Sequence, residues 1–412
     1  MIDVYIVGIA MTVFGRHLER RLENLAAEAL SAALEDANCN VEDIGIAFYA
    51  GITNGPLQGQ ISIPGQVVFS KIGVEGIPIY NVENACASGS SAFNLAVQSL
   101  RAGTTDVALA LGAEKMNILD KVKAFAVFEG GWDVSRVQEN YQTLVEMGQG
   151  VEVPPGSESD KPFSKFMEIY AAMCRLHMAT YGTTQRQIAA VSAKNHTHSV
   201  HNRFSQFRQP YSIDEILAAP PVTYPITLPM CAPLSDGSAA AIVCTDEGLA
   251  RIGADRGRCI KVAASVLKSF THRGIDQPEL AVGHLAARQA YEQAGLGPED
   301  MQVAEGHDAC AMGEILQAEN LGFVPFGGGG PAAERGDFTI GGRIPINPSG
   351  GLESKGHPLG ATGIGQLCEL VTQLRGEAGK RQVEGARHAI QENGGGMLGV
   401  EEAAVAIHIL SA

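Results

Sequence analysis

One cysteine stands where it could act as a nucleophile. Cys86 lies in the stretch NACASG (residues 84–89), between a predicted buried strand at residues 77–82 and a helix with apolar residues at helical spacing. We therefore expect Cys86 in the first turn of that helix. There, free backbone N–H groups and the helix dipole favour a thiolate, and small neighbours leave room for a substrate. The alternative is a buried structural cysteine, because the chain has eight cysteines and free cysteine packs like a small hydrophobe.

A glycine-rich segment at residues 347–365 contains a second candidate, His357, which precedes Pro358 at the predicted start of a helix. Such a loop brings the backbone close to a ligand and leaves the imidazole free to take a proton from a thiol. Phosphate binding by the glycines is the rival interpretation, but neither the Walker pattern nor the dinucleotide pattern fits.

A third candidate, His307, follows a predicted strand at residues 301–306. A histidine at a strand end can donate a hydrogen bond to a developing oxyanion. The alternative is a surface turn in which Asp308 caps the next helix.

A run of three glycines, Gly394 to Gly396, lies between the last two predicted strands. Glycines permit close approach of the backbone and leave N–H groups free for an oxyanion. A tight hairpin turn is the alternative, and this stretch alone does not separate the two.

Three histidines, His196, His198 and His201, could bind a metal by residue type. No acidic or cysteine ligand stands beside them, so a solvated helix or loop face is the favoured interpretation and no metal site is predicted.

Composition excludes several classes of function. The net charge of −15 and the lack of a basic run argue against a nucleic-acid partner. No apolar run is long enough to span a membrane, and the first residues lack a basic region and a cleavage motif, so we expect a cytoplasmic protein. The scattered cysteines form no Cys-x-x-Cys pair, which argues against a disulfide framework and a zinc cage.

The expected elements alternate between strands and helices, which predicts parallel sheets covered by helices. Residues 37–44 align with residues 294–301, and residues 89–101 align with residues 363–375, which indicates two duplicated halves. We place these halves at residues 1–250 and 251–412. An insertion at about residues 117–224 interrupts the first half, and we expect it to shape a pocket while its own apolar side chains form a core. Those side chains are Phe163, Phe166, Met167, Tyr170 and Met173.

Taken together, four motifs resemble the thiolase superfamily, and most closely the sterol-carrier-protein-type (lipid-transfer-protein-like) thiolases and acetyl-CoA acetyltransferases. The motifs are NACASG at residues 84–89, PMCAPLSDGSAA at 229–240, GHDA at 306–309 and GGLESKGHPLGATG at 350–363. The resemblance runs from residue 4 to residue 410. It implies an α/β, thiolase-like fold of two duplicated βαβαβαββ-type halves in a layered α-β-α-β-α arrangement, with a loop-domain insertion in the first half.

The resemblance also implies roles for the candidate residues. Cys86 would be the acylated nucleophile, His357 the base that activates it, and His307 a donor to the thioester oxygen. The N–H of Gly394 or Gly395 would complete an oxyanion hole with that of Cys86.

The sequence departs from the family pattern at the second acid/base cysteine. Where thiolases usually carry it, this chain has Glu392 or Asn393, and where the sterol-carrier type carries it, this chain has Ala309 followed by Cys310. Three candidates remain for this role: Glu392 with a pKa raised by burial, Cys310, or a water molecule held by the two histidines.

The function implied is cleavage of a 3-oxoacyl-CoA by free CoA, or the reverse Claisen condensation, through an acyl-cysteine intermediate. CoA and acyl-CoA would be substrates rather than permanently bound cofactors. Two alternatives stay open: a thiolase-like carbon-acyltransferase or aldolase without the second cysteine, and a non-catalytic scaffold subunit. The resemblance implies a homodimer or higher oligomer and allows a small zinc-containing OB-fold partner, as in some relatives that act in aromatic or steroid degradation.

Overall fold

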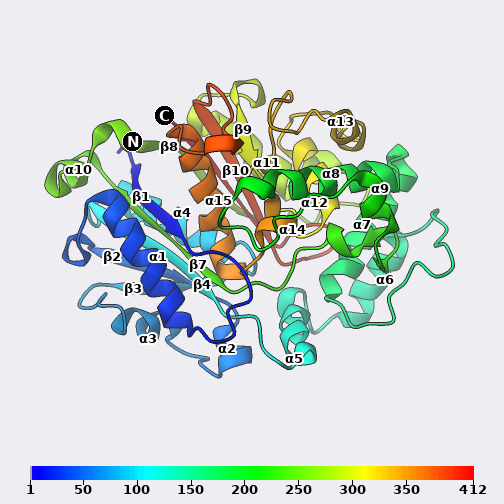
Figure 1. Cartoon of the computed structure of the whole chain (residues 1–412), viewed down its shortest axis with the longest axis horizontal. Coiled ribbons are helices and arrows are strands. Elements are labelled where there is room, and N and C mark those ends of the chain that lie inside the picture. The colour runs from blue at the N-terminus through cyan, green and yellow to red at the C-terminus, as the bar shows by residue number, and fades with distance from the viewer. Residues whose placement is uncertain (1) are drawn as a thin grey trace.

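Nine strands of residues 2–412, the part of the chain that the computed structural model describes, form one sheet in the order β3-β2-β4-β7-β1-β8-β11-β10-β9 (Figure 1). The first half contributes β1 (Tyr5–Met11), β2 (Ile46–Ala50), β3 (Ile79–Val82), β4 (Val107–Glu114) and β7 (Gly237–Cys244). The second half contributes β8 (Ile260–Ser269), β9 (Val303–Glu305), β10 (His388–Gly395) and β11 (Ala404–Ser411). The halves join where β1 pairs with β8.

The strand order and directions repeat on either side of this junction. In each half one parallel pair (β2 with β4, β9 with β10) is followed by two antiparallel pairs. Even an irregularity repeats, because Val7 in β1 and Ala263 in β8 are both passed over in the pairing register. The predicted duplication therefore appears in the backbone itself.

The prediction of parallel sheets is wrong for the last strand of each half. Each half ends with a strand, β7 or β11, that runs antiparallel to both of its neighbours. The reason lies in the connections: β11 returns from β10 by a hairpin, and β7 returns after the long insertion, so neither follows a helical crossover. The third strand of the second half is reduced to a single bridge between Ala304 and Ile346.

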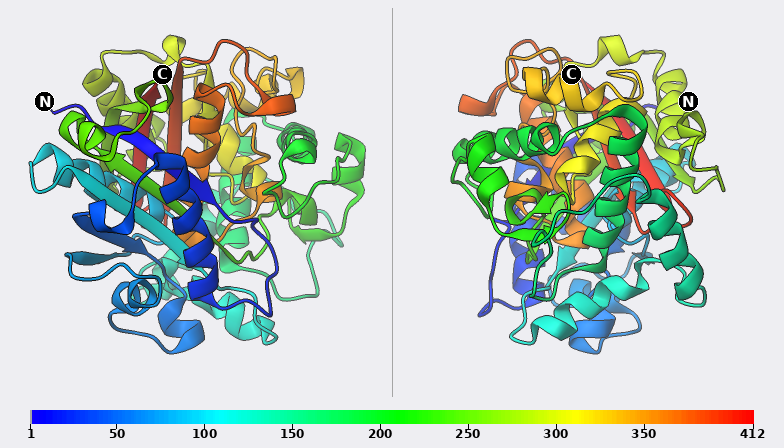
Figure 2. Two further views of the ribbon diagram at one scale, coloured as in Figure 1. Left: turned by 60° about the vertical axis from the view of Figure 1, so that its left-hand side comes forward. Right: turned by 90° about the vertical axis from the view of Figure 1, so that its right-hand side faces the viewer.

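Three hydrophobic cores separate five layers, which confirms the predicted α-β-α-β-α arrangement (Figures 1 and 2). The central layer contains α4 (Ser88–Arg101) and α15 (Leu359–Leu374), which lie between the two halves of the sheet. One outer layer contains α1 (Leu22–Ala37), α3 (Pro64–Ser70) and α10 (Asp246–Ile252). The other contains α11 (Val282–Ala294), α12 (Ala311–Asn320) and α13 (Gly329–Arg335).

Two glycines allow the start of α15 to lie directly against α4 and β4. A Cβ atom on Gly89 of α4 would lie 2.6 Å from the carbonyl oxygen of Gly360, and one on Gly112 of β4 would lie 2.0 Å from the same oxygen. Both distances are shorter than a carbon and an oxygen tolerate, so neither position accepts a larger residue. This close approach brings the residues before α4 next to the residues before α15.

The insertion occupies the chain between β4 and β7 and has its own core (Figure 1, right). It contains α5 (Lys121–Ala126), α6 (Val137–Met147), α7 (Lys165–Tyr181), α8 (Gln185–His198), α9 (Ile213–Ala218) and the short strands β5 (Pro221–Thr223) and β6 (Ile226–Thr227). Two further short helices, α2 (Asn54–Gln58) and α14 (Gly351–Lys355), lie in loops of the two halves. Across residues 2–412, no helix is both long enough and apolar enough to cross a bilayer.

Replacing Gly89 with Ala tests the contact between α4 and α15. Alanine ordinarily stabilises a helix by about 1 kcal/mol relative to glycine. Here the methyl group would meet the Gly360 backbone, so we expect Gly89→Ala to lower the free energy of unfolding by about 1–3 kcal/mol. Gly130→Ala is the control, because a Cβ atom there meets nothing within 4 Å. Equal urea midpoints for the two variants would contradict the proposed packing.

Candidate active site

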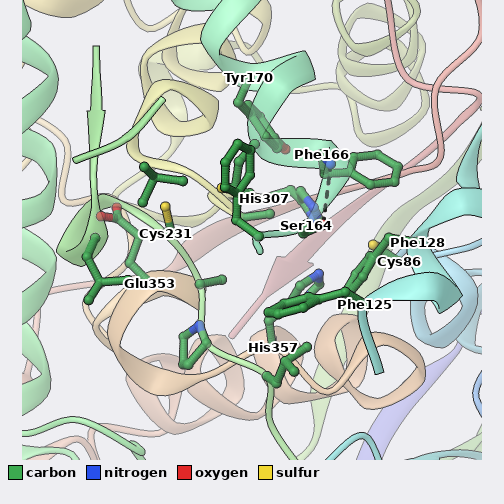
Figure 3. A pocket seen from close by; sticks show the side chains of 18 of the residues that line it. Cys86, Phe125, Phe128, Ser164, Phe166, Tyr170, Cys231, His307, Glu353 and His357 are labelled. Atoms are coloured by element: carbon green, nitrogen blue, oxygen red, sulfur yellow. Dashed lines mark hydrogen bonds between the residues drawn. The ribbon is translucent and has the colours of Figure 1, made fainter. Parts of the chain in front are cut away.

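Three reactive side chains meet at the junction of the two halves: Cys86 before α4, His307 after β9 and His357 before α15 (Figure 3). The Cys86 sulfur and one nitrogen of each imidazole all lie within 4.8 Å of one another. The two imidazole rings lie edge to face, with centroids 5.1 Å apart. All three side chains are buried. The structure thus brings together three residues that are widely separated in the sequence.

A tight turn presents Cys86 to this cluster. The helix α4 begins at Ser88, so the expectation that Cys86 lies in its first turn is wrong by two residues. The Asn84 N–H donates to the Ser88 hydroxyl oxygen at 2.9 Å, and that hydroxyl donates to the Ala85 carbonyl at 2.6 Å. Ala85 adopts a left-handed conformation with φ of 46°, which alanine rarely does. This strained residue explains why helical periodicity placed the start of the helix too early.

The surroundings of Cys86 favour the thiol rather than the thiolate. Burial is the main cause that raises its pKa to about 12; a hydrogen bond from the cysteine's own backbone N–H opposes this rise, and the nearby carboxyl groups of Glu114 and Glu83 add to it. The expectation that the helix dipole yields a resting thiolate is therefore wrong. Desolvation outweighs the dipole, so ionisation of Cys86 requires a base that accepts its proton as substrate binds.

His357 can act as that base. Its Nδ1 lies 2.7 Å from the Thr362 hydroxyl oxygen, and this hydroxyl donates its own proton to the Pro358 carbonyl at 3.0 Å. The Thr362 oxygen can therefore only accept, which puts the imidazole proton on Nδ1 and leaves Nε2 with a lone pair. Nε2 is buried without a hydrogen-bond partner. Burial lowers the pKa of His357 well below its usual value, with a further lowering from His307 and Lys355, so the ring is neutral.

His307 has the opposite tautomer. The Asn393 amide nitrogen donates to its Nδ1 at 2.9 Å, and the amide orientation is fixed because the Asn393 oxygen accepts from the Ser90 hydroxyl at 2.9 Å. Ser90 in turn accepts from the Gln391 amide at 2.7 Å. The proton of His307 is therefore on Nε2, where it can be donated to a substrate oxygen. Burial lowers the pKa of His307 to about 4, so this ring is neutral as well.

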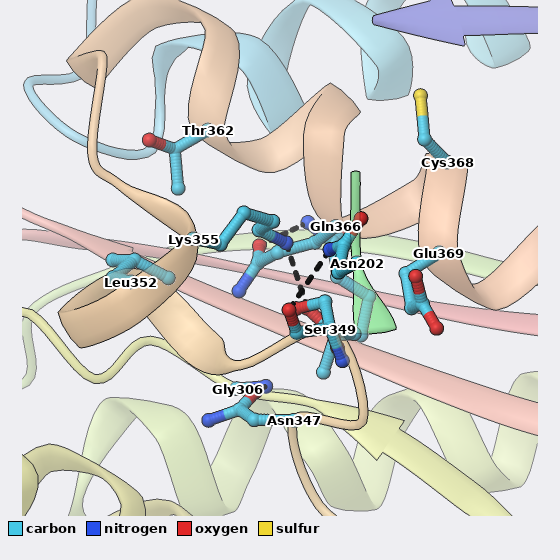
Figure 4. A network of polar contacts seen from close by, with 12 residues as sticks. Asn202, Gly306, Asn347, Ser349, Leu352, Lys355, Thr362, Gln366, Cys368 and Glu369 are labelled. Atoms are coloured by element: carbon cyan, nitrogen blue, oxygen red, sulfur yellow. Dashed lines mark hydrogen bonds and ion pairs between the residues drawn. The ribbon is translucent and has the colours of Figure 1, made fainter. Parts of the chain in front are cut away.

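A buried ion pair joins the loop of His357 to the strand of His307 (Figure 4). The Lys355 ammonium lies 2.9 Å from a carboxylate oxygen of Glu305, the last residue of β9. The same carboxylate accepts from the Ser349 hydroxyl at 2.8 Å and from its backbone N–H at 3.1 Å. These contacts hold the two histidine-bearing segments at a fixed separation.

Asp308 also takes part in this link rather than capping a helix. It accepts from the Leu352 backbone N–H at 2.7 Å and from the Asn195 amide at 2.9 Å, and it is buried. The next helix, α12, begins after Cys310 without a side-chain cap. The alternative of a surface turn is therefore wrong.

The two glycines at the end of β10 contact different parts of the structure. A Cβ atom on Gly395 would lie 2.2 Å from the Asn84 carbonyl and 2.6 Å from the Ala87 nitrogen, so Gly395 touches the turn that carries Cys86. Gly394 instead faces the side chain of Glu402. Both glycines line the cavity, so either N–H can face a bound substrate. Both glycines belong to the strand, and the hairpin begins after them.

Neither side chain proposed from the sequence as a second acid/base lies in the cavity wall. Glu392 is buried and accepts from the His307 backbone N–H at 2.8 Å. Cys310 is buried in the core of the insertion beside Cys174. Ala309, at the position where the family's sterol-carrier branch has its cysteine, does line the cavity.

The cluster opens into a cavity of about 390 Å³ between the insertion and the central layer (Figure 3). Its wall is mainly apolar and aromatic, and includes Phe125, Phe128, Phe163, Phe166, Met167, Tyr170, Phe207 and Tyr211. The expectation that the apolar residues of α7 form a core is confirmed, and Phe166, Met167 and Tyr170 also belong to the cavity wall. Periodicity identifies the buried face of a helix but not which part of that face meets a void.

Two of the three histidines at residues 196–201 are buried, so the prediction of a solvated face is wrong for them. His196 contacts the Pro229 carbonyl at 3.1 Å. His198 contacts the Asn347 carbonyl at 3.0 Å and accepts from the Ile340 N–H at 3.1 Å. These bonds fix the loop that precedes His357.

The structure is thus a duplicated five-layer α/β fold with a Cys–His–His cluster at the junction of its halves. The family model for the thiolase N-terminal domain matches residues 4–216, and the model described as thiolase C-terminal domain-like matches residues 270–410. The chain belongs to the thiolase family.

Its relatives include the sterol-carrier type that the sequence resembles. Sterol carrier protein 2 of Rattus norvegicus is 38% identical over 98% of this chain and 71% of its own length. An acetyl-CoA acetyltransferase of Methanothermobacter thermautotrophicus is 36% identical over the whole of both chains. The benzoylsuccinyl-CoA thiolase subunit BbsB of Thauera aromatica is 32% identical over 92% of this chain and 91% of its own.

Among solved structures, one named Ltp2-ChsH2(DUF35) aldolase superposes with a TM-score of 0.77 and covers 100% of this chain and 98% of that chain. Its sequence identity is 21%, so this likeness shows the shared fold alone.

The raised pKa of Cys86 predicts slow alkylation at neutral pH. Because only the thiolate reacts, the rate of iodoacetamide labelling of Cys86 should keep rising with pH through pH 10. Peptide mass spectrometry of the labelled protein measures this rate. A plateau below pH 8 would show that the resting residue is a thiolate and would contradict the raised pKa.

The tautomer of His357 predicts that Thr362 orients the imidazole for proton transfer, in addition to its role in packing. Thr362→Val removes the acceptor of the Nδ1 proton, so we expect the rate of Cys86 acylation to fall by about 10-fold or more. Thr372→Val is the matched control, because that hydroxyl bonds only the Cys368 carbonyl of the same helix. Equal rates for the two variants would show that Thr362 does not position the imidazole.

Proposed function

We propose that this protein is a CoA-dependent acyltransferase of the thiolase type, which cleaves a 3-oxoacyl-CoA with free CoA or runs the reverse condensation. The observation that carries the proposal is the opposite tautomers of the two neutral histidines beside Cys86. One ring offers a base and the other offers a proton donor, and both face the same cavity as the thiol. The family and the relatives named as an acetyltransferase and a CoA thiolase support it.

In the proposed reaction, His357 Nε2 takes the Cys86 proton as the sulfur attacks the 3-oxo carbon of the substrate. The N–H of Cys86, together with that of Gly394 or Gly395, stabilises the oxyanion that forms on the 3-oxo oxygen. The bond between C2 and C3 then breaks, and His307 Nε2–H donates to the thioester oxygen on which negative charge develops. Free CoA finally attacks the acyl-cysteine and releases the acyl group as a new thioester.

The burial of Cys86 suits this chemistry because the nucleophile is created only when it is needed. Because Cys86 and His357 are both neutral at rest, the resting protein avoids the free-energy cost of burying a separated thiolate and imidazolium in an apolar cavity. Proton transfer and attack then occur together, and the charge moves onto an oxygen that the cavity already surrounds with donors.

We also propose a subunit partnership. The relative BbsB is named as a subunit, and the Ltp2–ChsH2 structure is named as a two-component aldolase. A small zinc-containing OB-fold protein is the heterologous partner that the resemblance implies, and a second copy of this chain is the homologous one. In the sheet, β3 is an edge strand on which Tyr80 is half exposed, which leaves a side of the sheet on which a second copy could continue it.

An acyl adduct on Cys86 is the direct test of this function. Intact-protein mass spectrometry after brief mixing with acetyl-CoA or acetoacetyl-CoA should show a gain of one acetyl group on the wild type and none on Cys86→Ala. Turnover of Cys86→Ala should fall by about 10³-fold or more, because removing the nucleophile leaves only the oxyanion and binding contributions. An equal adduct on both proteins, or unchanged turnover without the thiol, would refute the proposal.

A further inference from the structure

Two carboxyl groups, those of Glu353 and Glu402, stand in the wall of the cavity that contains the reactive cluster. Glu402 belongs to the hairpin between β10 and β11 and lines the cavity with the three residues of the cluster. Its side chain packs over Gly394, where a Cβ atom would lie 2.8 Å from the Glu402 Cγ and 3.4 Å from its Oε1. The absence of a side chain at Gly394 therefore leaves the space that the Glu402 side chain occupies.

The two residues that flank Gly394 in β10 contact the cluster. Asn393, one residue before, holds the ring of His307, and Gly395, one residue after, touches the turn that carries Cys86. Side chains alternate between the two faces of a strand, so Glu402 lies over the other face of β10 and lines the cavity where the strand ends.

The remaining titratable groups of the wall are less suited to carry a proton. Figure 3 shows Glu353 near Cys231, across the cavity from Cys86. The Cys231 thiol contacts the Thr227 carbonyl. Burial raises the pKa of Tyr170 well above its usual value, and the charge of Glu402 makes the largest further contribution to this increase, which disfavours a phenolate.

Glu402 is oriented and poised as an acid. The Gln317 amide donates to its Oε1 at 3.1 Å, which fixes the carboxyl plane. Burial raises its pKa, and the neighbouring carboxylate of Glu401 raises it further. The half-buried side chain keeps contact with the cavity. A carboxyl group in such a place can both give a proton and take one back.

We propose that Glu402 gives and takes the proton at C2 of the substrate, the task for which this chain has no second cavity cysteine beside the cluster. This role rests on the proposed thiolase function and completes it with a named residue. Neither Glu392 nor Cys310 lines the cavity, whereas Glu402 does.

The protons balance through a full cycle. When the bond between C2 and C3 breaks, the electron pair moves onto C2 and the thioester oxygen, and C2 takes the proton of the Glu402 carboxyl group. His357 then holds the Cys86 proton and Glu402 is a carboxylate. As the sulfur of free CoA attacks the acyl-cysteine, its thiol proton passes to Glu402, the bond between the acyl carbon and Cys86 breaks, and His357 returns its proton to the sulfur.

Two half-reactions separate this role from the proposed function as a whole. Acylation of Cys86 by acetyl-CoA requires no proton at C2, whereas exchange of the acetyl-CoA methyl protons with D₂O requires one to leave. In Glu402→Gln we expect acylation within about threefold of the wild type, and both methyl exchange and thiolysis lowered by about 10²-fold or more. Glu402→Asp should restore part of the exchange, and Glu392→Gln should keep it.

The pH dependence provides a test on the wild type alone. Thiolysis starts from the carboxylic acid and should fall as pH rises through the raised pKa of Glu402, while methyl exchange starts from the carboxylate and should rise over the same range. Exchange in Glu402→Gln within threefold of the wild type, its loss in Glu392→Gln alone, or parallel pH profiles would overturn the role of Glu402. A wild type that acylates with no acyl-CoA would instead refute the proposed function.

Discussion

Burial of three ionisable side chains without a compensating charge is the constraint on which the site depends. Cys86, His307 and His357 meet where the two halves join, and desolvation there raises the pKa of the thiol and lowers the pKa of both imidazoles. Each group is therefore neutral at rest. Neutral histidines have distinct nitrogens, and the fixed partners Thr362 and Asn393 assign the base to one ring and the donor to the other.

The duplicated fold supplies the close contacts that make this burial possible. The helices α4 and α15 occupy equivalent places in the two halves and pack against each other through glycines, which brings the segments before them together. The Glu305–Lys355 ion pair then links the strand of one histidine to the loop of the other. A buried pair of this kind stabilises little by itself, but it restricts the geometry, since breaking it would leave an uncompensated charge in the core.

Sequence patterns predicted much of this architecture. The repeated motifs indicated the duplication, which the pairing register of β1 and β8 repeats. The antiparallel direction of β7 and β11 was not predicted, because strand direction depends on the connections between strands rather than on their composition. The left-handed backbone conformation of Ala85 could not be predicted, because an alanine side chain gives no indication of it. The sequence could not indicate Glu402, because it lies within a hairpin and only the fold shows that Gly394 leaves room for it in the wall of the cavity.

The neutral cluster with opposite histidine tautomers can be measured directly by ¹⁵N NMR of histidine side chains in selectively labelled protein, with His307 and His357 assigned by substituting each in turn. We predict that both rings stay neutral from pH 6 to pH 9, with the proton on Nδ1 of His357 and on Nε2 of His307. Signals of an imidazolium on either ring at pH 7 would show a resting ion pair with Cys86 and would contradict the neutral cluster.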